Sequence, residues 1–257
     1  MAEVSLNLIR KLKMKKIAPV FLLVLALASC TTAPIKPEQK ASLHNIAVVS
    51  LMGNELEFTK VGFTVFNNDK FTRETSDWKL DAEIERIATE ELKKSSSEIK
   101  MVLVPFDRAE LFKIYKPADS WGEYASIDRI TPELKMKLAQ TPVDAVLLVH
   151  KQRGEDPIAM TSVYLQGYGV YYRTLPLVDP LMKPYAMFTI VLLDGKTLKP
   201  ITAKYVRGVS TAFGKTQLSW DEKIKNNLSD QLLSEFKSDI NTVIESNLES
   251  GLKEMGL

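Results

Sequence analysis

The sequence of 257 residues has little of the two residue types that most often build metal and redox sites. It contains one cysteine, Cys30, and two histidines, His44 and His150. A single cysteine excludes an internal disulfide, a thiol redox pair and a zinc site of clustered cysteines. Two histidines leave few ligands for a histidine-built metal centre. The sequence therefore predicts neither a metal site nor a cofactor.

Motifs of the common catalytic sites are missing as well. The nearest approach to a nucleophile elbow, Gly208-Val209-Ser210-Thr211, lacks a second glycine at the required place. There is no H-E-x-x-H zinc motif and no calcium loop rich in Asp and Asn. Gly167-Tyr168-Gly169 has two of the three glycines of a dinucleotide-binding loop. Because no catalytic residue can be assigned, we expect a protein that is not an enzyme.

Long apolar runs are also scarce, and the longest one lies near the N-terminus. Five basic residues at positions 10–16 precede the apolar run 17–28, which is shorter than the roughly 20 residues that a membrane-spanning helix needs. A basic head, a short apolar body and small residues before a cleavage point predict a secretory signal peptide over residues 1–29. In an alternative interpretation, translation begins at Met14, just before Lys15 and Lys16.

The last residues of this segment, Leu27-Ala28-Ser29-Cys30, resemble the lipobox of bacterial lipoproteins. The resemblance implies cleavage between Ser29 and Cys30 and acylation of Cys30, which would anchor the chain in a membrane. In that family an Asp after the cysteine favours the inner membrane, whereas Thr31 stands here. The resemblance therefore implies a protein of the outer membrane that faces the periplasm.

The charge balance changes once residues 1–29 are removed. The full chain has 34 basic and 32 acidic residues. Taking away the five basic residues and the one acidic residue of 1–29 leaves 29 basic and 31 acidic residues, a net charge of −2. The mature chain thus lacks the basic excess of proteins that bind polyanions, and we expect no nucleic acid partner.

The pattern of the remaining chain predicts a tether over residues 30–43 and a single periplasmic domain over 44–257. Continuous apolar runs at 45–52, 100–106 and 143–150 indicate strands buried on both faces. Between them lie a helix over 80–94 and a short helix that begins at Thr131-Pro132-Glu133. This order is typical of an α/β fold with a partly parallel sheet. The predicted core consists of Ile46, Val48, Val102, Val104, Val146 and Leu148, covered by Ile84, Ile87 and Leu92.

The second half of the chain adds antiparallel strands and a long helix. The β-rich runs 185–193 and 200–209 flank Asp194-Gly195, and Asp-Gly between two such runs is typical of a hairpin. Ser219 and Glu222 form a capping-box pattern ahead of an apolar stripe that continues to Met255. The sequence therefore predicts a mixed sheet, with a parallel core and a late antiparallel hairpin, flanked by helices that include a long C-terminal helix.

Residues 160–187 are too apolar for a solvated loop and too rich in Gly and Pro for a regular element. Such a segment packs over its own domain or forms an interface, since aromatic rings with polar tips are favoured in contacts between proteins and at membrane surfaces. We take Tyr168, Tyr171 and Tyr172 as the candidate partner surface.

The mature chain also resembles a group of bacterial envelope lipoproteins with mixed α/β periplasmic domains, through the lipobox, the first strand Ile46-Ala47-Val48-Val49 and the strand at 143–148. The group includes the curli secretion-channel lipoprotein and the penicillin-binding-protein activator lipoproteins. The stretch 62–68 is similar to stretches in uncharacterised proteobacterial lipoproteins. The resemblance implies a non-catalytic accessory or scaffold role for another envelope protein. The alternative is an oligomeric secretion-channel subunit, a homo-oligomer whose 160–187 segment enters the outer membrane.

Overall fold

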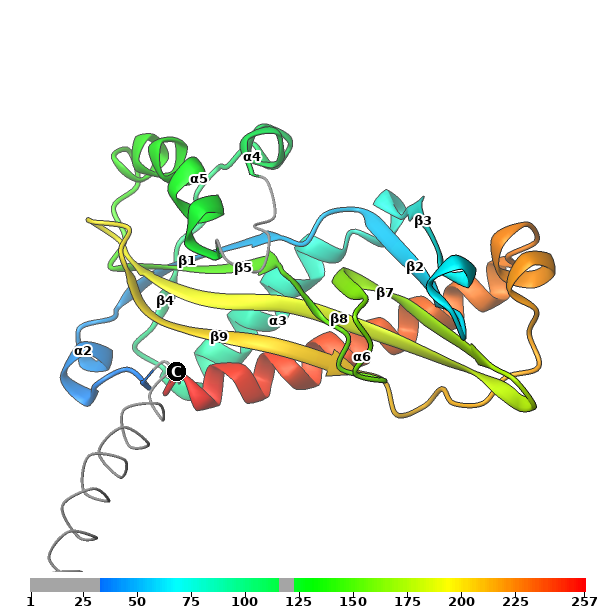
Figure 1. Cartoon of the computed structure of the whole chain (residues 1–257). Coiled ribbons are helices and arrows are strands. Elements are labelled where there is room, and N and C mark those ends of the chain that lie inside the picture. Colours follow the sequence, from blue (N-terminus) through cyan, green and yellow to red (C-terminus); the bar gives the residue numbers. More distant parts are fainter. Residues whose placement is uncertain (1–32, 116–122) are drawn as a thin grey trace, which may run out of the picture. The chain divides into compact units, whose positions relative to one another are not determined.

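The computed structural model of the chain describes residues 33–115 and 123–257. Residues Pro34–Leu257 make up one compact unit with its own hydrophobic core. The expected α/β class is confirmed: a nine-stranded mixed sheet is flanked by helices (Figure 1). Among the described residues, no helix combines the length and the apolar character needed to cross a bilayer.

The elements follow one another along the chain in a fixed order. The first half contains α2 (Pro37–Ala41), β1 (Asn45–Leu51), β2 (Glu55–Val61), the 3-10 turn η1 (Val65–Asn67), β3 (Asp69–Glu74), the 3-10 turn η2 (Ser76–Trp78), α3 (Leu80–Ser95), β4 (Lys100–Met101) and α4 (Arg108–Ile114). The second half contains α5 (Glu123–Leu138), β5 (Ala145–Lys151), β6 (Arg153–Glu155), β7 (Tyr164–Leu175), β8 (Val178–Asp194), β9 (Pro200–Val209), the short π-helix η3 (Trp220–Lys225) and α6 (Asp230–Glu254).

The long strand β8 organises the sheet. Its residues 178–187 pair with β7, its residues 188–194 pair with β5, and β9 pairs antiparallel with residues 185–193. Because a strand has only two edges, β5 and β7 share one edge of β8 and β9 occupies the other. The sheet therefore has two halves, with β5, β1 and β4 in one and β7, β2 and β3 in the other (Figure 1). The pairs β1–β4, β1–β5 and β2–β7 are parallel, as expected for a partly parallel core.

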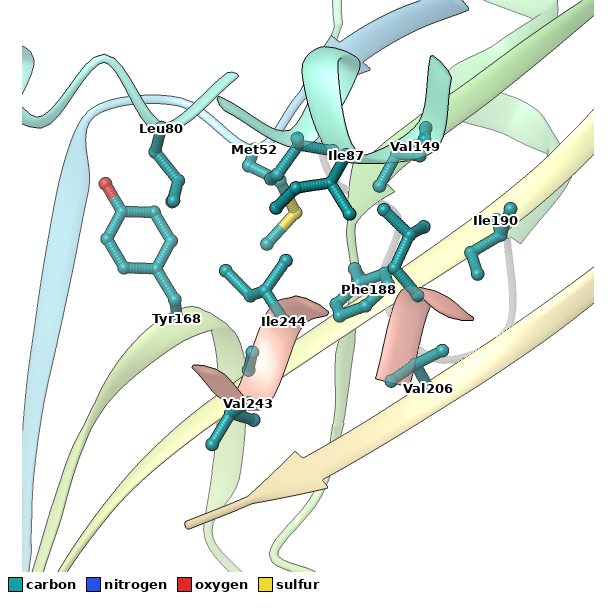
Figure 2. Packing of buried hydrophobic residues seen from close by; sticks show 14 of the residues in the cluster. Met52, Leu80, Ile87, Val149, Tyr168, Phe188, Ile190, Val206, Val243 and Ile244 are labelled. Atoms are coloured by element: carbon teal, nitrogen blue, oxygen red, sulfur yellow. The ribbon is translucent and has the colours of Figure 1, made fainter. Parts of the chain in front are cut away.

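The core lies on both faces of this sheet. Alternate residues of β5 point to opposite faces, so Leu147 and Val149 join the cluster under α3 and α6, whereas Val146 and Leu148 join a second cluster under α4 and α5. Figure 2 shows the first cluster, in which Ile87 of α3 and Ile244 of α6 meet Val149 and Phe188 of the sheet.

Most residues of the predicted core are buried, but they do not all lie on the same face of the sheet. Ile46, Val104, Val146 and Leu148 are buried, while Val48 and Val102 are only partly buried. Ile84, Ile87 and Leu92 share a cluster with Ile46 but not with Val146, Leu148 or Val104, which lie on the other face. The expected strand 100–106 is also wrong beyond β4: Val102 N still donates to Ile46 O, but Pro105 lacks an N–H and the chain turns.

Two helix boundaries differ from the expectation. α5 begins at Glu123 and continues through Pro132, and the Thr131 hydroxyl donates to Ile127 O rather than capping a helix. The C-terminal stripe is not one helix, because η3 ends at Lys225 and α6 starts at Asp230 with its own cap at Ser229. The Ser219 hydroxyl does accept from Glu222 N, so the predicted cap is present at the start of η3.

The folded unit begins earlier in the chain than expected. Ile35 and Leu43 are buried in the core, α2 lies between them, and Ile35 N donates to Met255 O at 2.9 Å. Apolar residues at both ends of the segment explain why it packs on the domain instead of extending into solvent. The folded unit therefore starts near Pro34, ahead of the predicted boundary at residue 44.

Candidate functional site

The tyrosines expected at a partner surface lie inside the molecule. Residues 164–175 and 178–194 form the strands β7 and β8, and Tyr168, Tyr171 and Tyr172 are all buried. Figure 2 shows the Tyr168 ring in the core near Leu80. Side chains that are already buried in the folded chain cannot present a surface to a partner, so this prediction is wrong.

Each of these hydroxyls has an internal partner, as buried tyrosines require. Tyr168 Oη donates to Gly53 O at 3.0 Å, and Tyr172 Oη donates to Leu218 O at 2.7 Å. On the opposite face, Tyr171 Oη donates to Asp156 Oδ2 at 3.0 Å. Burial is the main cause that raises the pKa of Tyr171, and the Asp156 carboxylate adds to it.

The glycines and prolines in this segment also have structural roles. A Cβ on Gly169 would lie 2.2 Å from Glu57 O and 2.6 Å from Tyr185 Oη, so only glycine lets these groups approach. Tyr185 Oη donates to Glu57 Oε1 at 2.7 Å, and burial raises the tyrosine's pKa well above its usual value. Pro184 cannot donate to the ladder, but its carbonyl accepts from Ser210 N. The segment is therefore a core hairpin.

His150 is a buried base whose pKa is strongly shifted. It is buried under α4, and this burial lowers its pKa from 6.5 to about 4. Tyr115 Oη donates its single proton to Lys151 O and lies 2.9 Å from His150 Nδ1, so Nδ1 carries a hydrogen and donates to Tyr115. The other ring nitrogen, Nε2, has no hydrogen-bond partner among the described residues. The ring is neutral and sealed in the core, where a substrate cannot reach it.

Asp81 is a buried carboxylic acid whose pKa is also shifted by burial. Burial raises the pKa of its carboxyl, which accepts from Ser50 Oγ, Met52 N and Gly53 N. These bonds join the end of β1 to the first turn of α3. An open pocket of about 370 Å³ lies beside it, lined by Lys79 and Arg108 among others, but Arg108 is already bonded to Glu85 at 2.6 Å.

A second open pocket, of about 480 Å³, lies between the end of α5 and the turn after β8. Its carboxylate, Asp144, accepts from the main-chain N–H groups of His44 and Asn45. Within the described ranges, no three His, Cys, Asp or Glu residues gather closely enough to hold a metal ion.

The most unusual surface lies on two loops that we call the apolar loops, residues 62–68 and 174–178. Six of the nine large hydrophobic side chains that are exposed in the described chain belong to them, with Phe66 94% and Leu177 106% exposed. The six are Phe63, Val65, Phe66, Leu175, Leu177 and Val178.

The parallel pairing of β2 and β7 brings the apolar loops together. Val61 and Arg173 are register partners, and each loop follows its strand directly beyond this pair. Parallel strands lie roughly 4.8 Å apart, so the loops leave the sheet side by side at the same edge. In Figure 1 they are found at the right, where β2 meets β3 and where β7 turns into β8.

Hydrogen bonds within the 62–68 loop hold its apolar side chains outward. Gly62 N donates to Asn68 Oδ1, and the Thr64 hydroxyl bonds to Asn67 Oδ1 at 2.7 Å. A Cβ on Gly62 would lie 2.3 Å from Asn67 Cβ, which explains the glycine.

The other loop is a tight turn in which Leu175 pairs with Val178 and Leu177 has a φ of 62°. A positive φ at this turn position favours Gly or Asn, and a leucine there is strained.

The apolar loops contain no ionisable side chain, and the charges just behind them are mainly basic. Lys60, Arg173 and Lys215 form no ion pair with any residue in the described ranges. The nearby acid Asp69, by contrast, is bonded to Lys225 at 2.7 Å and to Trp220, which lowers the pKa of its carboxyl. The surface is thus apolar at its tips and cationic behind them.

Sequence reasoning placed the candidate surface on the wrong part of this hairpin. The signal for the apolar loops was present: turns are usually polar, yet 62–68 and 174–178 hold Phe, Val and Leu and no charge. Ser29 and Cys30, the predicted cleavage and lipidation site, lie outside the described residues.

Searches of protein-family models and of curated proteins find no match. Among solved structures, the hypothetical protein CT253 from Chlamydia trachomatis is 12% identical, with a TM-score of 0.32, over 80% of this chain and 98% of that chain. The PelC dodecamer from Paraburkholderia phytofirmans is 12% identical, with a TM-score of 0.27, over 85% of this chain and 93% of that chain. A PelC variant is 14% identical, with a TM-score of 0.26 and coverages of 79% and 86%. Similarities at this level carry no inference about function.

Proposed function

We propose that the chain is a non-catalytic, lipid-anchored protein of the cell envelope that acts as an accessory or scaffold for another envelope component. The observation that carries this proposal is Leu27-Ala28-Ser29-Cys30 after a basic and then apolar segment. Acylation of Cys30 would hold the protein in the outer membrane with its domain in the periplasm.

The start of the folded unit supports this arrangement. Ile35 is buried and bonded to Met255, so only residues 31–34 separate it from Cys30. A segment that short reaches roughly 3.3–3.6 Å per residue when extended. An anchor on Cys30 therefore keeps the domain next to the lipid surface rather than at the end of a long linker.

The anchor is tested with Cys30→Ala in a bacterial host that processes lipoproteins. We expect the variant to lose palmitate labelling and to leave the membrane fraction or to keep its signal peptide. Several acyl chains hold a protein firmly where one holds it marginally, so loss of the acylated residue should be decisive. Thr31→Ala is the matched control and should behave as the unchanged chain. A Cys30→Ala chain that still labels with palmitate and fractionates with membranes would contradict the anchor.

The accessory role and the secretion-channel alternative differ in assembly state. One structural observation favours the alternative: β7 and β8 do form a hairpin, which the prolines of the sequence argued against, and its tip is apolar. Most of the hairpin is nevertheless paired within the domain's own sheet. Light scattering of the acylated protein in detergent separates the two proposals. A discrete ring supports the channel subunit, and a monomer or small assembly supports the accessory role.

A further inference from the structure

We propose that the apolar loops enter a lipid surface and give the domain a membrane contact separate from any anchor on Cys30. The occupant of this surface would be the headgroup and upper acyl region of a bilayer that contains anionic lipid. Phe63, Phe66 and Leu177 would be the inserted side chains.

The exposure of the side chains on the apolar loops is the first observation in favour of a membrane contact. Phe66 and Leu177 are almost fully in solvent, and neither belongs to any of the three hydrophobic clusters of the domain. Contiguous apolar side chains on a soluble surface mark a contact site more often than scattered ones do. Phenylalanine and leucine tips on a compact projection are suited to the boundary between headgroups and acyl chains.

The backbone conformation at the tip of the β7–β8 hairpin is the second observation. Leu177 has a positive φ, which strains an L-residue, and its exposed side chain makes no buried contact in return. Strain at an exposed bulky residue points to a role outside the folded chain. Beneath the tip, Met182 N donates to Gly214 O and Thr216 N donates to Pro180 O, both at 2.8 Å. The tip is thus braced by the 214–216 segment and held in a projecting position.

The charges behind the apolar loops favour an anionic lipid surface, rather than a second copy of the chain, as the partner. Lys60, Arg173 and Lys215 stand behind the tips without an ion pair in the described chain. Asp69 is paired with Lys225, whereas Asp179 accepts a hydrogen bond from the neutral Gln217 and keeps its charge, so these three cations outnumber it. Anionic headgroups would be attracted to these cations. In a two-fold dimer through the same loops, the cations of the two copies would face each other and repel.

The position of the apolar loops also predicts how the domain would lie on the membrane. Ile35 is hydrogen-bonded to Met255 at the end of α6. There α6 lies beside the second half of β8, because its Glu254 pairs with Lys204, the register partner of Ile190. The apolar loops lie at the other end, near the start of β8 (Figure 1). This orientation rests on the proposed anchor. A lipid on Cys30 together with inserted loops would attach the elongated sheet near both of its ends.

Site-specific fluorescence in the Pro34–Leu257 unit tests the proposal without the anchor, because this unit contains no cysteine. Phe66→Cys and Leu177→Cys each supply one thiol for the fluorophore NBD. Leu103→Cys, at a 92% exposed position two residues after β4, is the matched control.

With vesicles of phosphatidylethanolamine and phosphatidylglycerol, we expect a blue shift and a rise of about twofold or more in emission at 66 and 177, together with quenching by nitroxide-labelled lipid. The signal at 103 should not change. Unchanged emission at both loop positions would overturn the proposal. An emission change that appears without vesicles and grows with protein concentration would indicate a protein contact and would overturn it too.

A charge substitution gives an independent measurement. The unit carrying Phe66→Asp with Leu177→Asp should bind the same vesicles at least about tenfold more weakly in a sedimentation assay, since two inserted apolar side chains are replaced by anions. Its urea midpoint should stay near that of the unchanged unit, because both positions are exposed. Equal vesicle binding by the two units would contradict the inference, whatever the outcome at Cys30.

Discussion

Protonation of His150 should set much of the acid sensitivity of this fold. The imidazole is buried and neutral, with a pKa of about 4 in the folded chain against 6.5 for an unperturbed histidine. Between these two values the unfolded chain binds a proton at this position and the folded chain does not. Stability therefore rises with pH in this window and is lost as pH falls from about 6.5 toward 4.

The size of the effect follows from the same two values. Each unit of pKa difference corresponds to about 1.4 kcal/mol, so His150 should account for about 2–3 kcal/mol of lost stability between neutral pH and about pH 4.5. His150→Gln removes the titrating ring and keeps a polar group near Tyr115, whose hydroxyl still donates to Lys151 O. The variant should start less stable at neutral pH because it disturbs core packing.

The assay is urea unfolding of the Pro34–Leu257 unit at a series of pH values. The difference in unfolding free energy between the unchanged chain and His150→Gln should shrink by about 2 kcal/mol as pH falls from about 7 to about 4.5. Asp69 and Asp144, whose pKa values are lowered, titrate in both chains and cancel in the difference. Parallel pH curves for the unchanged chain and His150→Gln would refute the assignment.

Two further predictions concern the β7–β8 hairpin. Tyr172→Ala should cost about 3–5 kcal/mol in urea unfolding and Tyr172→Phe about 1, because the ring is buried and its hydroxyl makes one hydrogen bond; a loss below half a kcal/mol for Tyr172→Ala would place the ring at the surface. Leu177→Gly should raise the unfolding free energy by about 1 kcal/mol, since glycine accepts the positive φ without strain, and should weaken vesicle binding at the same time; a destabilised Leu177→Gly would contradict the turn geometry.

Local sequence patterns correctly predicted the bounds of elements whose apolar residues recur at regular spacing. The run 200–209 coincides with β9, and the helical stripe 80–94 coincides with α3 to within a residue. Such elements present one pattern to one environment, so spacing alone predicts them. The sequence did not predict which elements pack against each other. Which face Val146 or Ile84 occupies depends on where the helices return to the sheet, and the spacing of apolar residues does not contain that information.

The hairpin was missed because β7 is buried on both faces and its sequence does not alternate. Tyr168 packs against Trp78 just ahead of α3, and Tyr171 faces the 156–163 loop. Both environments accept a tyrosine because each hydroxyl finds a partner there. Gly169 weakens strand propensity in isolation, yet the close approach of Glu57 and Tyr185 requires it. The signals that argued against a strand thus came from contacts with residues far away in the chain.

The same segment held both the buried tyrosines and the exposed tip, and composition could not separate them. What separates Tyr171 from Leu177 is the pairing of β7 with β2, which ends at Val61–Arg173; beyond that pair β7 contacts only β8, and the tip projects past β2. Up to that pair, apolar side chains are explained by the core they build. Beyond it, Phe66 and Leu177 add no packing, and Leu177 adds strain. The stability of the domain does not account for these side chains, so their explanation must involve a surface outside it, and the adjacent unpaired cations point to an anionic lipid surface.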